Sequence, residues 1–166
     1  ESLESRKAEL EELILALAAP YQQELAILQT APGISSDFTA IGIISEIGTN
    51  MEAFPSAKHL CSWAGLTPTN NESAGKKKSV RVSKAGCYIK PLLVQCANAV
   101  VKSSKHPEMR NRYLRLKKRR GHKKAIIAIA RMLLTALYHM LKNGENYNAE
   151  LYRKSDLPPV DREITV

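Results

Sequence analysis

The chain has 166 residues, 44% of them hydrophobic and 5% aromatic, and its net charge of +9 comes from 25 Lys and Arg against 16 acids. This length and composition can bury one ordinary core. No apolar run reaches the roughly 20 residues of a membrane span, and no signal-sequence pattern is found, so we expect a cytoplasmic protein without a membrane partner. Three cysteines without CxxC spacing and four scattered histidines argue against a disulfide framework and a metal site.

Apolar residues recur every seven positions in the first 28 residues, with Glu and Lys beside them. The two series are Leu3, Leu10 and Leu17, and Ile14, Tyr21 and Leu28. This pattern predicts a coiled-coil arm over residues 1–24 that joins copies of the chain, with a kink or a restart at Pro20. A plain amphipathic helix packed on its own domain would show the same pattern. Because the repeat already includes residue 1, we expect the chain to be the later part of a longer protein.

Residues 25–48 predict two helices joined by a tight turn at Gly33. Ser36 or Asp37 would cap the second helix and Gly48 would end it. The arrangement resembles a helix-hairpin-helix element, in which backbone N–H groups near Gly33 would contact a DNA phosphate. A plain αα-hairpin that serves only packing explains the same residues.

A short helix is predicted from Pro55 to Ala64, with Phe54, Leu60 and Trp63 in the core. Residues 66–86 then lose the helical period. Turn-forming residues come first and an alternating run follows, so we expect a basic loop or a short β-hairpin.

Three further helices are predicted over 88–103, 107–120 and 122–141, and the last is the most apolar and therefore the central core helix. We predict a mostly α-helical fold with its main domain at 25–145. Residues 146–166 have little periodicity and are expected to form a docked or disordered tail without chemistry.

The most uneven feature of the chain is its charge distribution. Residues 76–124 contain seventeen Lys or Arg and one acid, Glu108, which is a local excess of +16. Apolar residues at helical spacing interrupt this block, as expected for a folded surface that binds a polyanion such as nucleic acid, although a merely solvated face has a similar composition. The candidate DNA- or RNA-binding residues are Gly33, Lys76, Lys77, Lys78, Arg81, Lys84, Lys90, Arg115, Arg119, Arg120, Lys123 and Lys124.

Ser73 lies in a turn-forming run just before three lysines. A serine hydroxyl can attack a phosphodiester when nearby cations neutralise the developing charge, so Ser73 is a candidate nucleophile. A turn or capping residue is the more ordinary role for a serine before Ala-Gly.

An ordered series of motifs between residues 25 and 152 resembles the C-terminal transposase domain of the DEDD-type insertion-sequence transposases, which are bridge-RNA-guided recombinases. After Gly86, Lys90 stands where that family commonly has Arg, which keeps the charge and loses the forked geometry. The motifs are Ala31-Pro32-Gly33-Ile34, Glu46-Ile47-Gly48, Phe54-Pro55-Ser56-Ala57, Trp63-Ala64-Gly65-Leu66-Thr67-Pro68, Glu72-Ser73-Ala74-Gly75, Ser83-Lys84-Ala85-Gly86 and Arg119-Arg120-Gly121-His122-Lys123-Lys124-Ala125.

The resemblance implies a DNA recombinase in which Ser73 forms a covalent link to the cleaved strand. It also implies a preceding RuvC-like domain whose acids bind Mg²⁺, a guide (bridge) RNA, and a bacterial, nucleoid-associated protein. Because this chain has no acidic cluster, we expect the fragment alone to be inactive. A site-specific invertase related to the pilin-gene invertases and a non-catalytic DNA- or RNA-binding module remain alternatives, and Ser79 or Ser83 could face the phosphate in place of Ser73.

Overall fold

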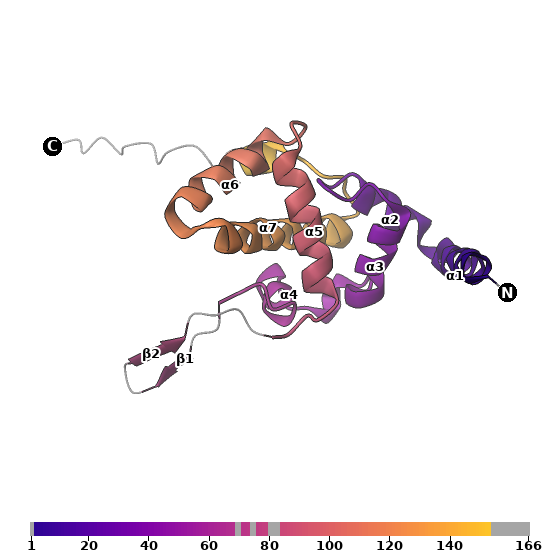
Figure 1. Cartoon of the computed structure of the whole chain (residues 1–166), viewed down its shortest axis with the longest axis horizontal. Helices are drawn as coiled ribbons and strands as arrows, with labels where there is room; N and C mark the ends of the chain where they lie inside the picture. Colours follow the sequence, from indigo (N-terminus) through magenta and orange to yellow (C-terminus); the bar gives the residue numbers. More distant parts are fainter. Residues whose placement is uncertain (1, 69–70, 74–75, 80–83, 154–166) are drawn as a thin grey trace.

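The fold is described from a computed structural model, which covers residues 2–68, 71–73, 76–79 and 84–153, with the strands and residues 152–153 described by their backbone (Figure 1). The helices are α1 (Leu3–Ala18), η1 (Ala19–Tyr21), α2 (Gln22–Gln29), α3 (Asp37–Ile47), η2 (Met51–Ala53), α4 (Ala57–Trp63), α5 (Ile89–Lys102), α6 (Pro107–Arg120), α7 (His122–Asn143) and α8 (Glu150–Arg153). Two short strands, β1 (Asn71–Ser73) and β2 (Lys76–Ser79), pair in an antiparallel hairpin. The predictions of a mostly α-helical fold and of a short basic hairpin are therefore confirmed.

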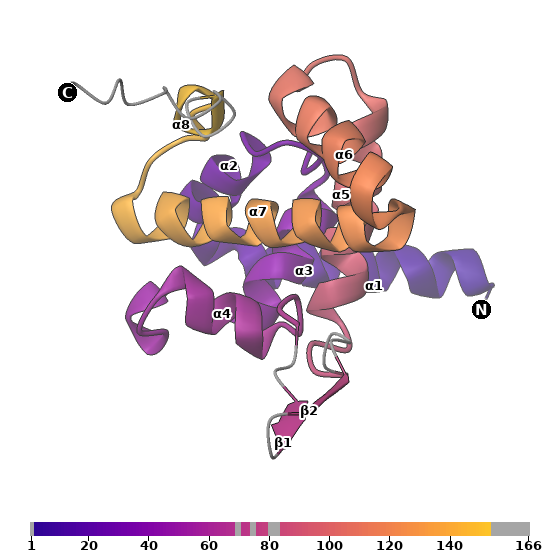
Figure 2. The same ribbon diagram turned by 90° about the vertical axis from the view of Figure 1, so that its left-hand side faces the viewer.

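Helix α7 lies at the centre, and α2, α4, α5 and α6 pack against it (Figure 2). Its apolar residues recur at helical spacing, and Ile129, Leu133, Leu134 and Leu137 are completely buried. Burial of each such side chain contributes roughly 1.5–3 kcal/mol, so this helix supplies much of the stability of the domain. By length and composition α7 could also cross a membrane. However, 56% of its most apolar 18-residue stretch is buried inside the protein, which is typical of the core helix of a globular domain.

The two helices predicted over 25–48 are present as α2 and α3, and Gly48 ends α3 with φ +69°. Ser36 is the N-cap residue, although its side chain makes no capping hydrogen bond, and the Gln29 amide instead donates to the Asp37 carboxylate. The turn lies against α5, where a Cβ at Gly33 would come within 2.6 Å of the Cys96 carbonyl oxygen. This close approach supports a packing role for the turn, and a phosphate contact there stays a prediction.

Two details of the α4 prediction are wrong. The helix begins at Ala57 instead of Pro55, because the Ser56 hydroxyl accepts the His59 N–H and caps it. Trp63 is 45% exposed, since this seven-residue helix faces the core through Leu60 and Cys61. The Trp63 ring packs against the Phe54 ring at the surface, with ring centroids 5.7 Å apart.

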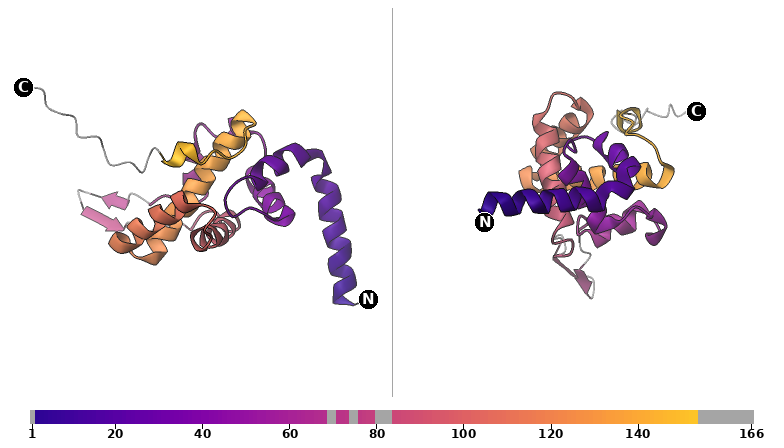
Figure 3. Two further views of the ribbon diagram at one scale, coloured as in Figure 1. Left: turned by 90° about the horizontal axis from the view of Figure 1, so that it is seen from above. Right: turned by 90° about the vertical axis from the view of Figure 1, so that its right-hand side faces the viewer.

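Helix α1 extends away from the other helices, and η1, which contains Pro20, separates it from α2 as predicted (Figure 3). Only Ala18 of α1 is buried, while Leu3 is 87% and Leu17 68% exposed. The alternative prediction, an amphipathic helix packed on its own domain, is therefore wrong for most of the length of α1. Pairing of α1 in a coiled coil stays a prediction, as do the domain boundaries 1–24, 25–145 and 146–166.

The segment after α7 docks on the domain through Tyr147. Its N–H donates to Thr30 Oγ1 over 2.9 Å, and its hydroxyl donates to Glu108 Oε1 over 3.2 Å. The predicted tail is thus docked at this point, and residues 154–166 lie outside the described residues.

Candidate nucleic-acid interface

The β1–β2 hairpin projects from the helices, between α4 and α5 in the chain (Figures 1 and 2). Ser73 pairs with Lys76 at the last position before the turn, Glu72 pairs with Lys77, and the register shifts between Asn71 and Glu72. This shift leaves Lys78 as an extra residue opposite that step. The candidate nucleophile is therefore at the end of β1, with the three predicted lysines on the return strand.

The sequence predicted three serines as candidates for the phosphate, and the structure describes two of them. Ser73 is at the turn end of the hairpin, whereas Ser79 ends β2 opposite Asn71, toward the domain. Ser83 and the predicted contact Arg81 lie outside the described residues.

The base of the hairpin is closed by two glycines from its opposite ends. A Cβ at Gly86 would collide with the Ala64 backbone, and a Cβ at Gly65 would collide with the carbonyl of Ala85. Gly65 and Gly86 both have positive φ, 66° and 68° respectively. The two ends of the hairpin therefore need glycine both for the backbone conformation and for the close approach of the two chains. Lys84 is exposed beside this base. The Lys90 ammonium is also close, 2.8 Å from the position of a Gly65 Cβ.

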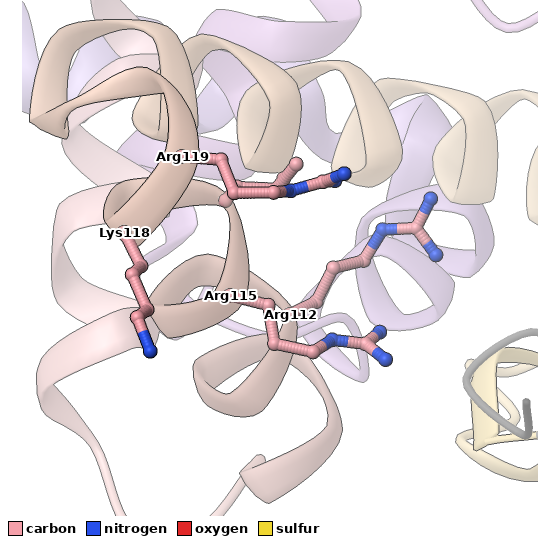
Figure 4. Close-up of a pocket in the computed structure, with 5 residues that line it drawn as sticks. Arg112, Arg115, Lys118 and Arg119 are labelled. Atoms are coloured by element: carbon pink, nitrogen blue, oxygen red, sulfur yellow. The ribbon is translucent and has the colours of Figure 1, made fainter.

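Helix α6 carries a second group of cations. Four basic side chains and Leu116 line an open hollow of about 520 Å³ on its surface. The guanidinium groups of Arg112, Arg115 and Arg119 extend to the same side of it, while Lys118 points elsewhere (Figure 4). Guanidinium groups so arranged can hold phosphate oxygens through forked hydrogen bonds.

Basic residues continue from α6 across Gly121 into α7, and we call residues 117–124 the α6–α7 corner. Lys117 lies over the Tyr113 ring, 5.7 Å from its centroid. Among the residues that the structure describes, no carboxylate forms an ion pair with any of the other cations of this corner. These cations are Lys118, Arg119, Arg120, Lys123 and Lys124.

The one acid of the basic block is turned into the protein. Glu108 is 6% exposed, and it accepts the Tyr147 hydroxyl and lies 3.5 Å from His106 Nδ1. Its carboxylate therefore anchors the docked C-terminal segment. The last turn of α6 therefore presents four exposed cations and contains no acid.

The hairpin and the α6–α7 corner lie at the same end of the molecule, and α1 extends from the opposite end (Figures 1 and 3). In the sequence these two basic groups are separated by helix α5. The fold brings them to one side because the loop after α4 and the turn after α6 both leave the core there.

Other reactive side chains give weaker candidates. Burial raises the pKa of Cys96 to about 11 and also raises that of Cys61, which hydrogen-bonds Thr135. Thiols with raised pKa values are poor nucleophiles. Lys142, near Glu52 at the far end of α7, has its pKa raised by that carboxylate. In the described part of the chain no three His, Cys, Asp or Glu side chains are placed to hold a metal ion.

The family model described as "Transposase IS116/IS110/IS902 family" matches residues 25–114, from α2 through the hairpin into α6. The chain belongs to this transposase family. The expected resemblance to insertion-sequence transposases is thus confirmed at the level of the family.

Relatives of this transposase-family chain include proteins of two kinds. An uncharacterized 43.6 kDa protein of insertion element IS110 from Streptomyces coelicolor is 29% identical over 127 residues, covering 75% of this chain and 30% of that protein. Pilin gene-inverting proteins of Moraxella bovis and Moraxella lacunata are each 28% identical over 131 residues, covering 76% of this chain and 39% of theirs. The chain therefore spans between 30% and 39% of the length of these relatives.

The site residues fall on both sides of the family match. Ser73 and the hairpin lie inside residues 25–114, while the whole α6–α7 corner lies beyond them. One residue of the corner, His122, was missed as a functional candidate by sequence reasoning. Its contact with Tyr113 spans nine positions and a break at Gly121, so helical periodicity gives no signal for it.

Proposed function

We propose that this chain is the C-terminal catalytic part of a DNA recombinase that cleaves and rejoins DNA through a covalent bond to Ser73. Membership in a transposase family supports this proposal, and so do the basic surfaces at one end of the domain. The position of Ser73 carries it: the residue ends β1 at the turn of a projecting hairpin, opposite Lys76. A nucleophile for a DNA phosphate needs such a place, because the duplex must approach without colliding with the domain.

In the proposed reaction, Ser73 Oγ attacks the phosphorus of a phosphodiester. An Oγ–P bond forms while the bond from phosphorus to one sugar oxygen breaks; the serine proton passes to a base, and the leaving oxygen gains a proton. Rejoining is the reverse attack by a sugar hydroxyl, which releases the serine. Cations stabilise the extra negative charge of the transition state, and we assign this role to Lys76, Lys77, Lys78, Arg81 and Lys84.

The described residues do not fit a magnesium site. We propose that the acids that bind Mg²⁺ belong to a RuvC-like domain outside this chain, and we derive no step through the metal. In this proposal the chain alone does not cut DNA, and pairing of α1 between copies brings the two parts together. The whole protein would act in the bacterial cytoplasm with a guide (bridge) RNA, in association with the nucleoid.

The decisive test uses the full-length parent protein with labelled target DNA, guide RNA and Mg²⁺. A denaturing gel should show a covalent protein–DNA product that is lost in Ser73→Ala and retained in Ser79→Ala, a matched serine of the same hairpin. A product that persists in Ser73→Ala would remove Ser73 from the mechanism. Loss in Ser79→Ala alone would move the nucleophile to the other strand.

The names of the Moraxella relatives support a second candidate, a DNA invertase acting at a fixed site. Both candidates use the same strand chemistry, and they differ in how the target is found. Strand exchange that continues after the RNA is removed with ribonuclease would favour the invertase. The absence of a covalent product in every arm, with salt-sensitive DNA binding retained, would instead indicate a non-catalytic binding module.

A further inference from the structure

The turn between α6 and α7 is held by a contact between Tyr113 and His122. The Tyr113 hydroxyl and His122 Nδ1 are 2.8 Å apart, and the two rings meet edge to face with centroids 6.0 Å apart. Tyr113 is buried, whereas His122 is exposed. When the phenol donates to Nδ1, the imidazole hydrogen is on Nε2, and the ring is held with Nε2 as its remaining donor.

The charges beside His122 do not serve the helix that carries them. Lys123 and Lys124 complete a first turn of α7 that contains no acid, and Gly121 before it offers no side-chain cap. Positive charge at this end opposes the helix dipole and destabilises the helix. The end of α6 adds further cations without ion-pair partners among the described residues. The dipole of α6 accounts for the cations at its own C-terminal end, but the dipole of α7 does not account for Lys123 and Lys124, which an anionic partner explains.

We infer that the α6–α7 corner binds the phosphodiester backbone of duplex DNA, with His122 as a hydrogen-bond donor held in position by Tyr113. Lys123 and Lys124 supply the charge for this contact. The His122 donor supplies direction, because a lysine ammonium rotates freely and an imidazole fixed at Nδ1 does not. A contact of this kind positions DNA without reading its sequence.

The place of the corner identifies the DNA segment. The corner and the hairpin lie at one end of the molecule, so a duplex that reaches Ser73 passes on the side where the corner is exposed (Figures 1 and 3). This inference rests on the proposed function for its choice of DNA. It adds that the corner holds the same duplex that the hairpin reacts with.

The test is binding of a labelled DNA duplex to the 166-residue chain, measured by fluorescence anisotropy at pH 8 and at several salt concentrations. His122→Ala should lower the affinity about 3–10-fold and change the salt dependence less than Lys123→Gln does, because it removes a directed hydrogen bond and not a lysine ammonium. Lys123→Gln should lower the slope of log K against log salt by about 0.9.

Tyr113→Phe keeps the ring and removes the hydroxyl that orients His122. It should lower the affinity as much as His122→Ala does, and the double variant should lose no more than either single variant. If Tyr113 had only a structural role, Tyr113→Phe would lower the melting temperature and its effect on affinity would not be coupled to that of His122→Ala. Additive losses, or full affinity in Tyr113→Phe, would overturn the positioning role.

Matched controls are present in the chain. His139→Gln, near the other end of α7, and Lys7→Gln, on α1, change the same residue types far from the corner and should leave the affinity unchanged. An RNA duplex of the same sequence that binds more tightly, and loses more affinity in the variants, would overturn the assignment to DNA. Unchanged DNA affinity in His122→Ala and Lys123→Gln would overturn the site. Because no strand is cut, these outcomes are separate from the fate of the Ser73 adduct.

Discussion

Helices α6 and α7 pack against each other and are joined at Gly121, yet they use their side chains in opposite ways. Helix α7 buries apolar residues along its whole length, from Ala125 to Met140. Helix α6 buries only Glu108, Met109 and Tyr113 and exposes the four cations of its last turn. The difference separates two tasks: α7 holds the fold, and the exposed surface of α6 is available for a partner. Substitutions on the two helices should therefore fail in different assays.

The largest stability effect should come from the core side of this comparison. Leu133→Ala removes a completely buried side chain and should lower the free energy of unfolding by about 2–5 kcal/mol. Leu114→Ala on α6, which is 49% exposed, should change it by less than about 0.5 kcal/mol. Urea unfolding followed by circular dichroism measures both. Equal losses would mean that α6 contributes to the core as α7 does.

An intermediate effect is expected at the base of the hairpin. Gly86→Ala adds a Cβ that collides with the Ala64 backbone, and it forces a positive φ on alanine, so it should cost about 2–4 kcal/mol. Gly121→Ala has the same sign of φ, 81°, but open space around it, and should cost about 1–2 kcal/mol. Thermal unfolding of both variants tests this order. If Gly121→Ala were the more damaging, the close approach at the hairpin base would not be what demands glycine.

The smallest stability effect belongs to the α6–α7 corner. Replacing Lys118 and Arg119 with Gln should change the free energy of unfolding by no more than about 0.5 kcal/mol, because relief of like-charge repulsion offsets the lost interaction with the C-terminal end of the α6 dipole. The same change should clearly weaken DNA binding and reduce its salt dependence. A large loss of stability would show that these cations support the fold, and the contrast between α6 and α7 would fail.

Helix boundaries were predicted well where local chemistry marks them. Helix α6 begins and ends where Pro107 and Gly121 indicated. Helix α7 begins at its predicted residue, and α5 begins one residue after its predicted start. Proline and glycine act on their own backbone, so such signals survive whatever the rest of the chain does. The start of α4 was missed because two local signals compete there, and the Ser56 cap prevails over Pro55.

The candidate site was predicted in its parts and not in its arrangement. Ser73, the lysines after it and the cations of α6 were all recognised from residue type and spacing. Their gathering at one end of the molecule depends on how α5, α6 and α7 cross, and no local pattern encodes that crossing. The Tyr113–His122 contact was missed for the same reason.

The sequence by itself determined the helical class, the position of the core helix and the strongly basic character of residues 76–124, because periodicity and charge are properties of residues in order. Tertiary structure decided which of these charges remain available. It buried Glu108, which accepts a hydrogen bond from Tyr147, and it closed the base of the hairpin through Gly65 and Gly86. It also left α1 outside the core except at Ala18. Burial and close approach depend on contacts between distant segments, so only the packed chain could settle them.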